Sequence, residues 1–169
     1  MRSRNTLAFA LAVAAITPVP GPVQAGEGGD LARQLRAAAQ PLLAPSPEET
    51  ALTRSLVEIL GMATQAAERG NLPGAVQATL GEAHAAWRRS PEALPGPGVR
   101  AALGEAYTGL HGGHAFEFPA GVHSIDEARE ACRKQIDRAA GALETGRFAE
   151  ATRGMVEFLL TVTTPMEAH

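Results

Sequence analysis

Residues 124–144 have the sequence SIDEAREACRKQIDRAAGALE, and this stretch decides the fold class. Its apolar residues recur at intervals of three and four, as they do on one face of an amphipathic helix. They are Ile125, Ala128, Cys132, Ile136, Ala139 and Leu143. Ser124 followed three residues later by Glu127 forms a capping box, which predicts that the helix begins there. Because Gly146 supplies a helix stop, we predict one helix between these two signals.

The same spacing recurs on both sides of this stretch. Downstream, apolar residues from Phe148 to Val162 predict a helix that stops before Pro165 and completes a hairpin at about 124–164. Upstream, a capping box at 46–49 opens a helix that ends at Gly70, and the next helix completes a hairpin at about 47–89. Two shorter helices are expected at about 29–43 and from about 99 to the glycine pair at 112–113. The sequence therefore predicts an all-α, antiparallel bundle of about six helices built from two helical hairpins.

The amino terminus has the three zones of a cleavable signal peptide. Arg2 and Arg4 form a basic start, an apolar run follows at 7–16, and Val23-Gln24-Ala25 offers small residues for cleavage. The run has about half of the roughly 20 residues that a membrane-spanning helix needs, and no cysteine follows that could accept a lipid. We therefore expect cleavage near Ala25/Gly26 and a periplasmic or secreted product without a stable membrane anchor.

Length and charge limit what the remaining chain does. Residues 26–169 have the size of one domain, here a single all-helical domain with one core. With Arg2 and Arg4 removed, 13 basic residues face 18 acidic ones, so the formal charge is −5. This balance disfavours nucleic acid as a partner. The single cysteine excludes a Cys-x-x-Cys-His attachment run, and with it covalent haem.

Two segments interrupt the helical pattern. Residues 91–98, Pro-Glu-Ala-Leu-Pro-Gly-Pro-Gly, favour neither helix nor strand and predict a linker. Residues 111–123 form a loop that brings three histidines and one acidic residue together in sequence. Because imidazole is a good ligand for copper and zinc, His111, His114 and His123 are candidate metal ligands, with Glu117 as a fourth.

The loop also has a purely structural interpretation. His111 is expected at a helix C-terminus, where a cationic side chain is stabilised, and His123 directly precedes an N-cap. On the helices, His84 lies at the edge of an apolar stripe, as an ordinary half-buried histidine does. Cys132 lies on a predicted core face, where a thiol behaves as a small apolar group.

These observations leave two classes of function open. The first is a non-enzymatic binding or interaction protein of the periplasm that takes a protein or small-molecule partner, because helical hairpins present grooves and no catalytic motif is apparent. The second is a copper- or zinc-binding protein that uses the histidine loop, in which case the metal would be its cofactor.

Overall fold

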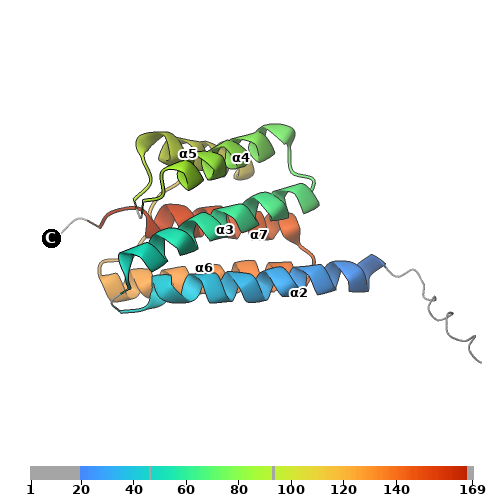
Figure 1. The fold of residues 1–169 in the computed structure, drawn as a ribbon, viewed down its shortest axis with the longest axis horizontal. Helices are drawn as coiled ribbons and strands as arrows, with labels where there is room; N and C mark the ends of the chain where they lie inside the picture. Colours follow the sequence, from blue (N-terminus) through green and yellow to red (C-terminus); the bar gives the residue numbers. More distant parts are fainter. Residues whose placement is uncertain (1–19, 46, 93, 167–169) are drawn as a thin grey trace, which may run out of the picture.

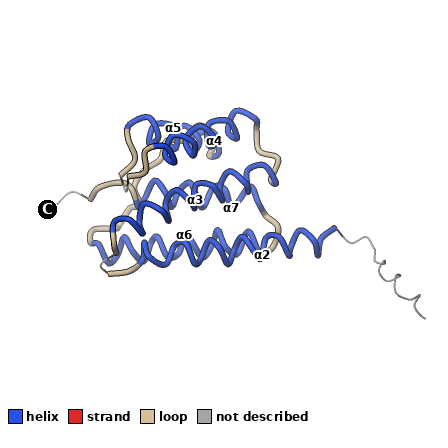
Figure 2. Tube along the Cα trace, viewed as in Figure 1, coloured by secondary structure: helices blue, strands red, loops and turns tan. Residues whose placement is uncertain are grey.

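A computed structural model describes residues 20–45, 47–92 and 94–166, which contain helices, turns and loops but no strand (Figure 2). The predicted all-α class is thus confirmed for these residues. Residues 1–19, which hold most of the expected signal peptide, lie outside them. The elements are α2 (Pro20–Ala39), the 3₁₀ helix η2 (Gln40–Leu43), α3 (Glu49–Arg69), α4 (Gly74–Arg89), α5 (Pro97–Leu110), α6 (Ile125–Glu144) and α7 (Phe148–Val162).

The six α-helices pack in two layers of three (Figure 1). One layer holds α2, α3 and α4 in chain order, with α3 in the middle. The other holds α6, α7 and α5, and each of its helices packs against one helix of the first layer. The central pair, α3 and α7, is therefore covered by helices on both sides, whereas one long face of α3 remains at the surface.

The core forms where the apolar stripes of the helices meet, and its buried side chains make one continuous cluster. The largest fully buried side chains include Trp87, Phe158, Leu60 and Leu103, which come from four different helices. Trp87 also has a polar role, because its indole Nε1 donates a hydrogen bond to the carbonyl oxygen of Glu92 at 2.7 Å. This bond ties the segment that follows α4 to the core.

The predicted helix starts have mixed outcomes. Ser124 caps α6 as expected: its Oγ accepts a hydrogen bond from the backbone N–H of Glu127 at 3.1 Å. The start predicted at 46–49 is shifted along the chain. The first helical residue of α3 is Glu49, and the N-cap is Glu48, which makes no side-chain capping bond. The carboxylate of Glu48 instead accepts a hydrogen bond from the hydroxyl of Thr50 at 2.6 Å, and Ser46 lies outside the described residues.

Prolines explain most of the shifted boundaries. The first helix begins at Pro20 instead of about 29, so it includes the expected cleavage junction, and it changes to 3₁₀ geometry after Ala39. Pro41, which has no backbone N–H to continue the α-helical ladder, lies at that change. In the linker, α5 begins at Pro97, since proline is favoured at the first position of a helix. The segment between α4 and α5 is therefore 90–96 instead of 91–98.

The turn after α3 confirms the predicted stop, because α3 ends at Arg69 and Gly70 is its C-cap. The residue that takes the left-handed conformation is Asn71, with φ of 52°, and the N–H of Leu72 reaches back to the carbonyl of Ala67 at 3.1 Å. Gly70 serves a different purpose, because a Cβ there would lie 2.8 Å from the backbone nitrogen of Ala149. It allows α3 to approach the start of α7. The turn after α6 does use glycine as expected, with Gly146 at φ of 75°.

One predicted core residue is exposed. Ile125 was expected in the buried stripe of α6, yet it is 62% exposed. It is the first residue of the helix, where the side chain lines an open pocket at the end of the bundle. The next stripe positions along α6, from Cys132 to Leu143, are buried.

Candidate functional site

The loop histidines have different surroundings. His111 ends α5, where its Nδ1 lies 2.9 Å from the carbonyl oxygen of Tyr107 and its ring stacks on the Tyr107 ring at 3.8 Å between centroids. His114, Glu117 and His123 are exposed. Within the described part of the chain, no three histidine, cysteine or acidic side chains are positioned to share a metal ion. The predicted metal ligands therefore do not form an assembled site, and metal binding stays a prediction.

Aromatic contacts organise the same loop. The ring of Phe116 meets the edge of Tyr107 at 5.4 Å between centroids, and Phe116 packs against the core cluster. Burial, with smaller effects from Glu157 and Glu117, raises the pKa of Tyr107. Phe116 and the stacked His111 therefore attach the loop to the core. This geometry agrees with the interpretation of the loop as purely structural.

Cys132 is buried in α6, with 4% of its surface exposed. Burial raises its pKa to about 11, so the group is a neutral thiol at physiological pH. A thiolate is the reactive form of cysteine. This environment agrees with the prediction that Cys132 acts as a small apolar core residue.

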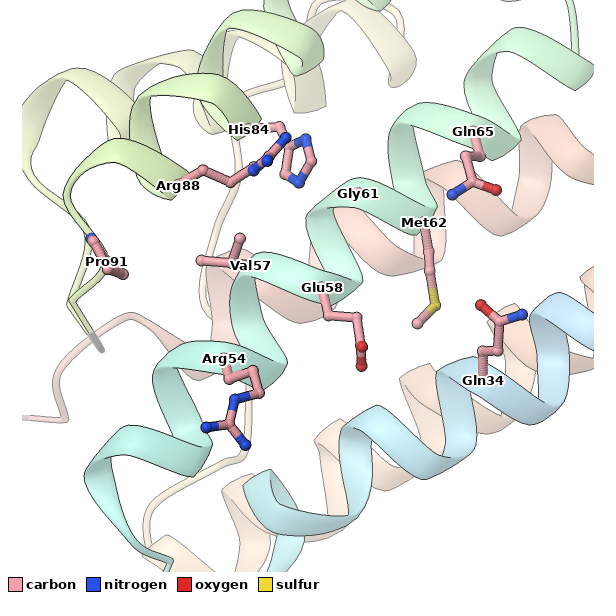
Figure 3. A pocket seen from close by; sticks show the side chains of 10 residues that line it. All are labelled: Gln34, Arg54, Val57, Glu58, Gly61, Met62, Gln65, His84, Arg88 and Pro91. Carbon is pink, nitrogen blue, oxygen red and sulfur yellow. The ribbon is translucent and has the colours of Figure 1, made fainter.

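A hollow with polar side chains crosses the surface of the α2–α3–α4 layer (Figure 3). We call it the α3 groove. It has a volume of about 460 Å³ and is lined by Gln34 of α2, by Arg54, Val57, Glu58, Gly61, Met62 and Gln65 of α3, by His84 and Arg88 of α4, and by Pro91. The exposed face of α3 forms its base, and α2 and α4 form its two sides.

Helical spacing places these side chains. On α3, Arg54, Glu58 and Gln65 lie four and seven residues apart, so they follow one another along the exposed face. On α4, His84 and Arg88 are four residues apart and lie next to each other, facing α3 (Figure 3). The groove therefore collects polar groups from two neighbouring helices, and Gln34 adds an amide from the third.

Gly61 allows α4 to bring His84 onto α3. A Cβ at Gly61 would lie 3.0 Å from Nε2 of His84, so a larger residue would push the imidazole away. Partial burial and the nearby positive charge of Arg88 lower the pKa of His84. The imidazole is therefore neutral at pH 7, and no hydrogen bond to its ring is found among the described residues.

The two arginines of the groove differ from most others in the chain. Seven described arginines pair with carboxylates: Arg33, Arg36, Arg69, Arg129, Arg133, Arg138 and Arg147. Arg100 and Arg153 instead donate to the carbonyl oxygens of Thr163 and Leu110. Arg54 and Arg88 make neither kind of contact with the described residues, and Arg89 beside them shares this property. Glu58 in the same groove also has no ion pair with a described residue.

A second hollow, of about 320 Å³, lies at the end of the bundle where η2, α6 and the end of α7 meet. Its lining is mainly apolar and includes Leu42, Phe118, Ile125 and the thiol-bearing Cys132. Its one cation, Arg129, already pairs with Asp126 at 2.6 Å. This pocket therefore offers apolar surface but few polar groups that could orient a ligand.

Sequence reasoning missed the α3 groove. It noticed His84 but assigned it a structural role, and it did not consider Arg54, Glu58 or Arg88. The available signal was the run of charged residues at helical spacing on the outer face of α3. That signal alone cannot be distinguished from an ordinary solvated helix face.

Comparison of the chain with known protein families, curated proteins and solved structures finds no match. Of the helices that the structure describes, none combines the length and apolar character that crossing a membrane requires.

Proposed function

We propose that this chain is an exported, non-enzymatic binding protein of the periplasm and that the α3 groove is its ligand site. The observation that carries the proposal is the set of charged side chains in that groove. Arg54, Arg88 and Glu58 face one hollow yet have no ion-pair partner among the described residues. Charged groups that are already positioned but unpaired are available to a ligand.

The size of the groove favours a small molecule over a protein partner. Ligand pockets are typically concave hollows of roughly 300–1,000 Å³ with a few well-placed polar groups among apolar ones. The α3 groove has about 460 Å³ and combines Val57 and Met62 with charged and amide side chains. The groove also lies on packed helices, and sites on helices hold their side chains more precisely than sites on loops do.

The construction of this scaffold from two helical hairpins is part of the proposal. Contacts between α3 and α4, and between α6 and α7, support it. The connections between these helices, at 70–73 and 145–147, are also short. Such short connections favour two consecutive helices that run in opposite directions. Export is supported by the basic, apolar and small-residue zones of residues 1–25.

The binding function is tested with a groove-filling variant and a matched control. Gln65 and Gln40 are both exposed glutamines, but only Gln65 lines the α3 groove. A small-molecule library would be screened by ligand-observed NMR against the purified protein, Gln65→Trp and Gln40→Trp. We expect hits that bind the protein and Gln40→Trp but not Gln65→Trp. Hits that bind all three proteins equally would contradict the assignment of the α3 groove as the ligand site.

The histidine loop is the second proposal: a copper or zinc ion bound by His111, His114 and His123, with Glu117 as a fourth ligand. The glycine pair that separates His111 from His114 supports it, because Gly112 and Gly113 have φ of 64° and 95° and can adopt conformations closed to other residues. Nδ1 of His111 lies at hydrogen-bond distance from the carbonyl oxygen of Tyr107, so Nε2 is the nitrogen of this ring that would bind the ion.

A further inference from the structure

We propose that the hollow at the end of the bundle is a second ligand site, which takes a small, uncharged, apolar molecule. We call this hollow the end pocket. It has a volume of about 320 Å³, and the larger apolar side chains that line it are Leu42, Leu52, Phe118, Ile125, Val162 and Met166. It shares no lining residue with the α3 groove, so this inference goes beyond the proposed function and does not depend on it.

Distant parts of the chain build the end pocket. Its lining comes from η2, the start of α3, the loop before α6, the first turns of α6 and the end of α7. The end of η2, the start of α6 and the end of α7 lie at the same end of the bundle (Figure 1). Small-molecule pockets are concave hollows of roughly 300–1,000 Å³ with mainly apolar walls. The volume of the end pocket is at the lower limit of this range, which favours a small ligand.

The walls of the end pocket have apolar surface that a ligand would cover. Leu42, Phe118 and Val162 are half-buried. Ile125 is 62% exposed, and it is one of two large apolar side chains that are exposed in the described part of the chain; the other is Leu94. Removing such surface from water is favourable in proportion to the apolar area that is covered. An apolar molecule in the end pocket would therefore be stabilised by contact with these side chains.

The polar groups of the end pocket already have partners among the described residues. Arg129 pairs with Asp126 at 2.6 Å. The hydroxyl groups of Thr161 and Thr164 each donate a hydrogen bond to the carbonyl oxygen four residues earlier in α7. A charged ligand would lose its hydration in this pocket and would have to displace an existing partner to gain a new one. The pocket therefore favours an uncharged ligand.

Cys132 provides a direct readout of occupancy. It is the one cysteine of the chain, and its thiol group lines the end pocket with 4% of the residue exposed. Because a bound molecule would cover this side chain, it should slow the reaction of Cys132 with N-ethylmaleimide. Mass spectrometry measures this rate without interference from other thiol groups.

The experiment titrates the full, purified protein with three probes that share one ring and differ in charge: toluene, benzoate and benzylamine. Binding is followed by amide and methyl NMR shifts and by the rate at which Cys132 is modified. We expect toluene to bind most tightly, to shift the signals of residues that line the end pocket, and to protect Cys132. Tighter binding of benzoate or benzylamine in this pocket would overturn the uncharged ligand. Toluene shifts confined to the α3 groove would overturn the site.

The variant Ile125→Asn and its matched control Leu94→Asn locate the site. Both residues are exposed and apolar, but only Ile125 lines the end pocket. Ile125→Asn should weaken toluene binding roughly tenfold, because it removes a branched apolar side chain from the wall. Leu94→Asn should leave the affinity unchanged, and equal losses in the two variants would overturn the inference.

Sedimentation of the same proteins tests a different occupant of the end pocket. We expect the unmodified protein and Ile125→Asn to have the same oligomeric state. A dimer that Ile125→Asn abolishes would show that a second copy of the chain covers the pocket, and it would overturn the small-molecule site.

Discussion

The imidazole of His84 on α4 lies directly over Gly61 of α3, so close that a Cβ at Gly61 would come within 3.0 Å of Nε2. A glycine in one helix thus sets the position of a titratable side chain in the next. His84 and Arg88 reach the α3 groove through this approach (Figure 3). Gly28 of α2 also has a close neighbour. Alanine substitutions at Gly61 and Gly28 therefore show how much stability the protein loses when each contact is disturbed.

Gly61→Ala and Gly28→Ala are expected to differ in their effect on stability. At Gly61 the neighbour is the end of a side chain that can move, and alanine gains about 1 kcal/mol of helix propensity, so we expect a change of less than about 1 kcal/mol. At Gly28 the neighbour is the backbone carbonyl of Leu143, which cannot move alone. We expect Gly28→Ala to lower the free energy of unfolding by about 1–3 kcal/mol. Urea denaturation measures both values, and equal effects would contradict the packing described.

His84 should make stability depend on pH. Its pKa in the folded protein is lowered by burial and by Arg88, so between that value and the ordinary 6.5 the unfolded chain binds the extra proton. The stabilising effect of the neutral imidazole is present above pH 6.5 and is lost as pH falls through the lowered pKa. The other charged residues of the groove, Arg54 and Glu58 of α3, point away from His84 (Figure 3). Denaturation of the protein and of His84→Gln from pH 7.5 to 5 should show a smaller loss in the variant, and parallel losses would refute this role.

Metal binding by the histidine loop should be weak, because no three metal-binding side chains of the described residues are positioned to share an ion. Calorimetric titration of the metal-stripped protein with Cu(II) and Zn(II) at pH 7 would measure it. The proposal requires one equivalent that the triple variant His111→Ala, His114→Ala, His123→Ala does not bind, with release near pH 5–6 as histidines protonate. Identical curves for the protein and the variant would eliminate the loop as a metal site.

Export predicts a defined amino terminus. Expression of the full chain in a bacterium with a general secretion route should give a periplasmic product that begins at Gly26, which mass spectrometry identifies directly. Ala25→Arg should leave the uncleaved precursor, because the cleavage site requires small residues. Cleaved product with an unchanged start in Ala25→Arg would show that the junction lies elsewhere.

Local signals were enough to predict the helices. The spacing of apolar residues located all six α-helices of the described chain, and Ser124 located the start of α6. The stop of α3 at Gly70 was predicted as well, but its tertiary role was not. The left-handed residue of this turn is Asn71, and only the approach of Ala149 shows why a glycine is needed at position 70.

The groove could not be predicted in the same way, because it depends on which helices become neighbours. Arg54 and Arg88 are 34 positions apart, and each alone is an ordinary exposed residue on a helix. Their common hollow exists because α4 packs beside α3. The histidine loop shows the converse case: its histidines are close in sequence, yet no three metal-binding side chains of the described residues are positioned to share an ion.

The most direct test of the central claim is the binding of small-molecule hits to Gln65→Trp relative to the unmodified protein. If the α3 groove is the ligand site, an indole side chain on its base should abolish the ligand-observed NMR signal of binding, whereas Gln40→Trp, which lies outside the groove, should bind as the unmodified protein does. Hits that bind Gln65→Trp within twofold of the unmodified protein would contradict the assignment of the α3 groove as the ligand site.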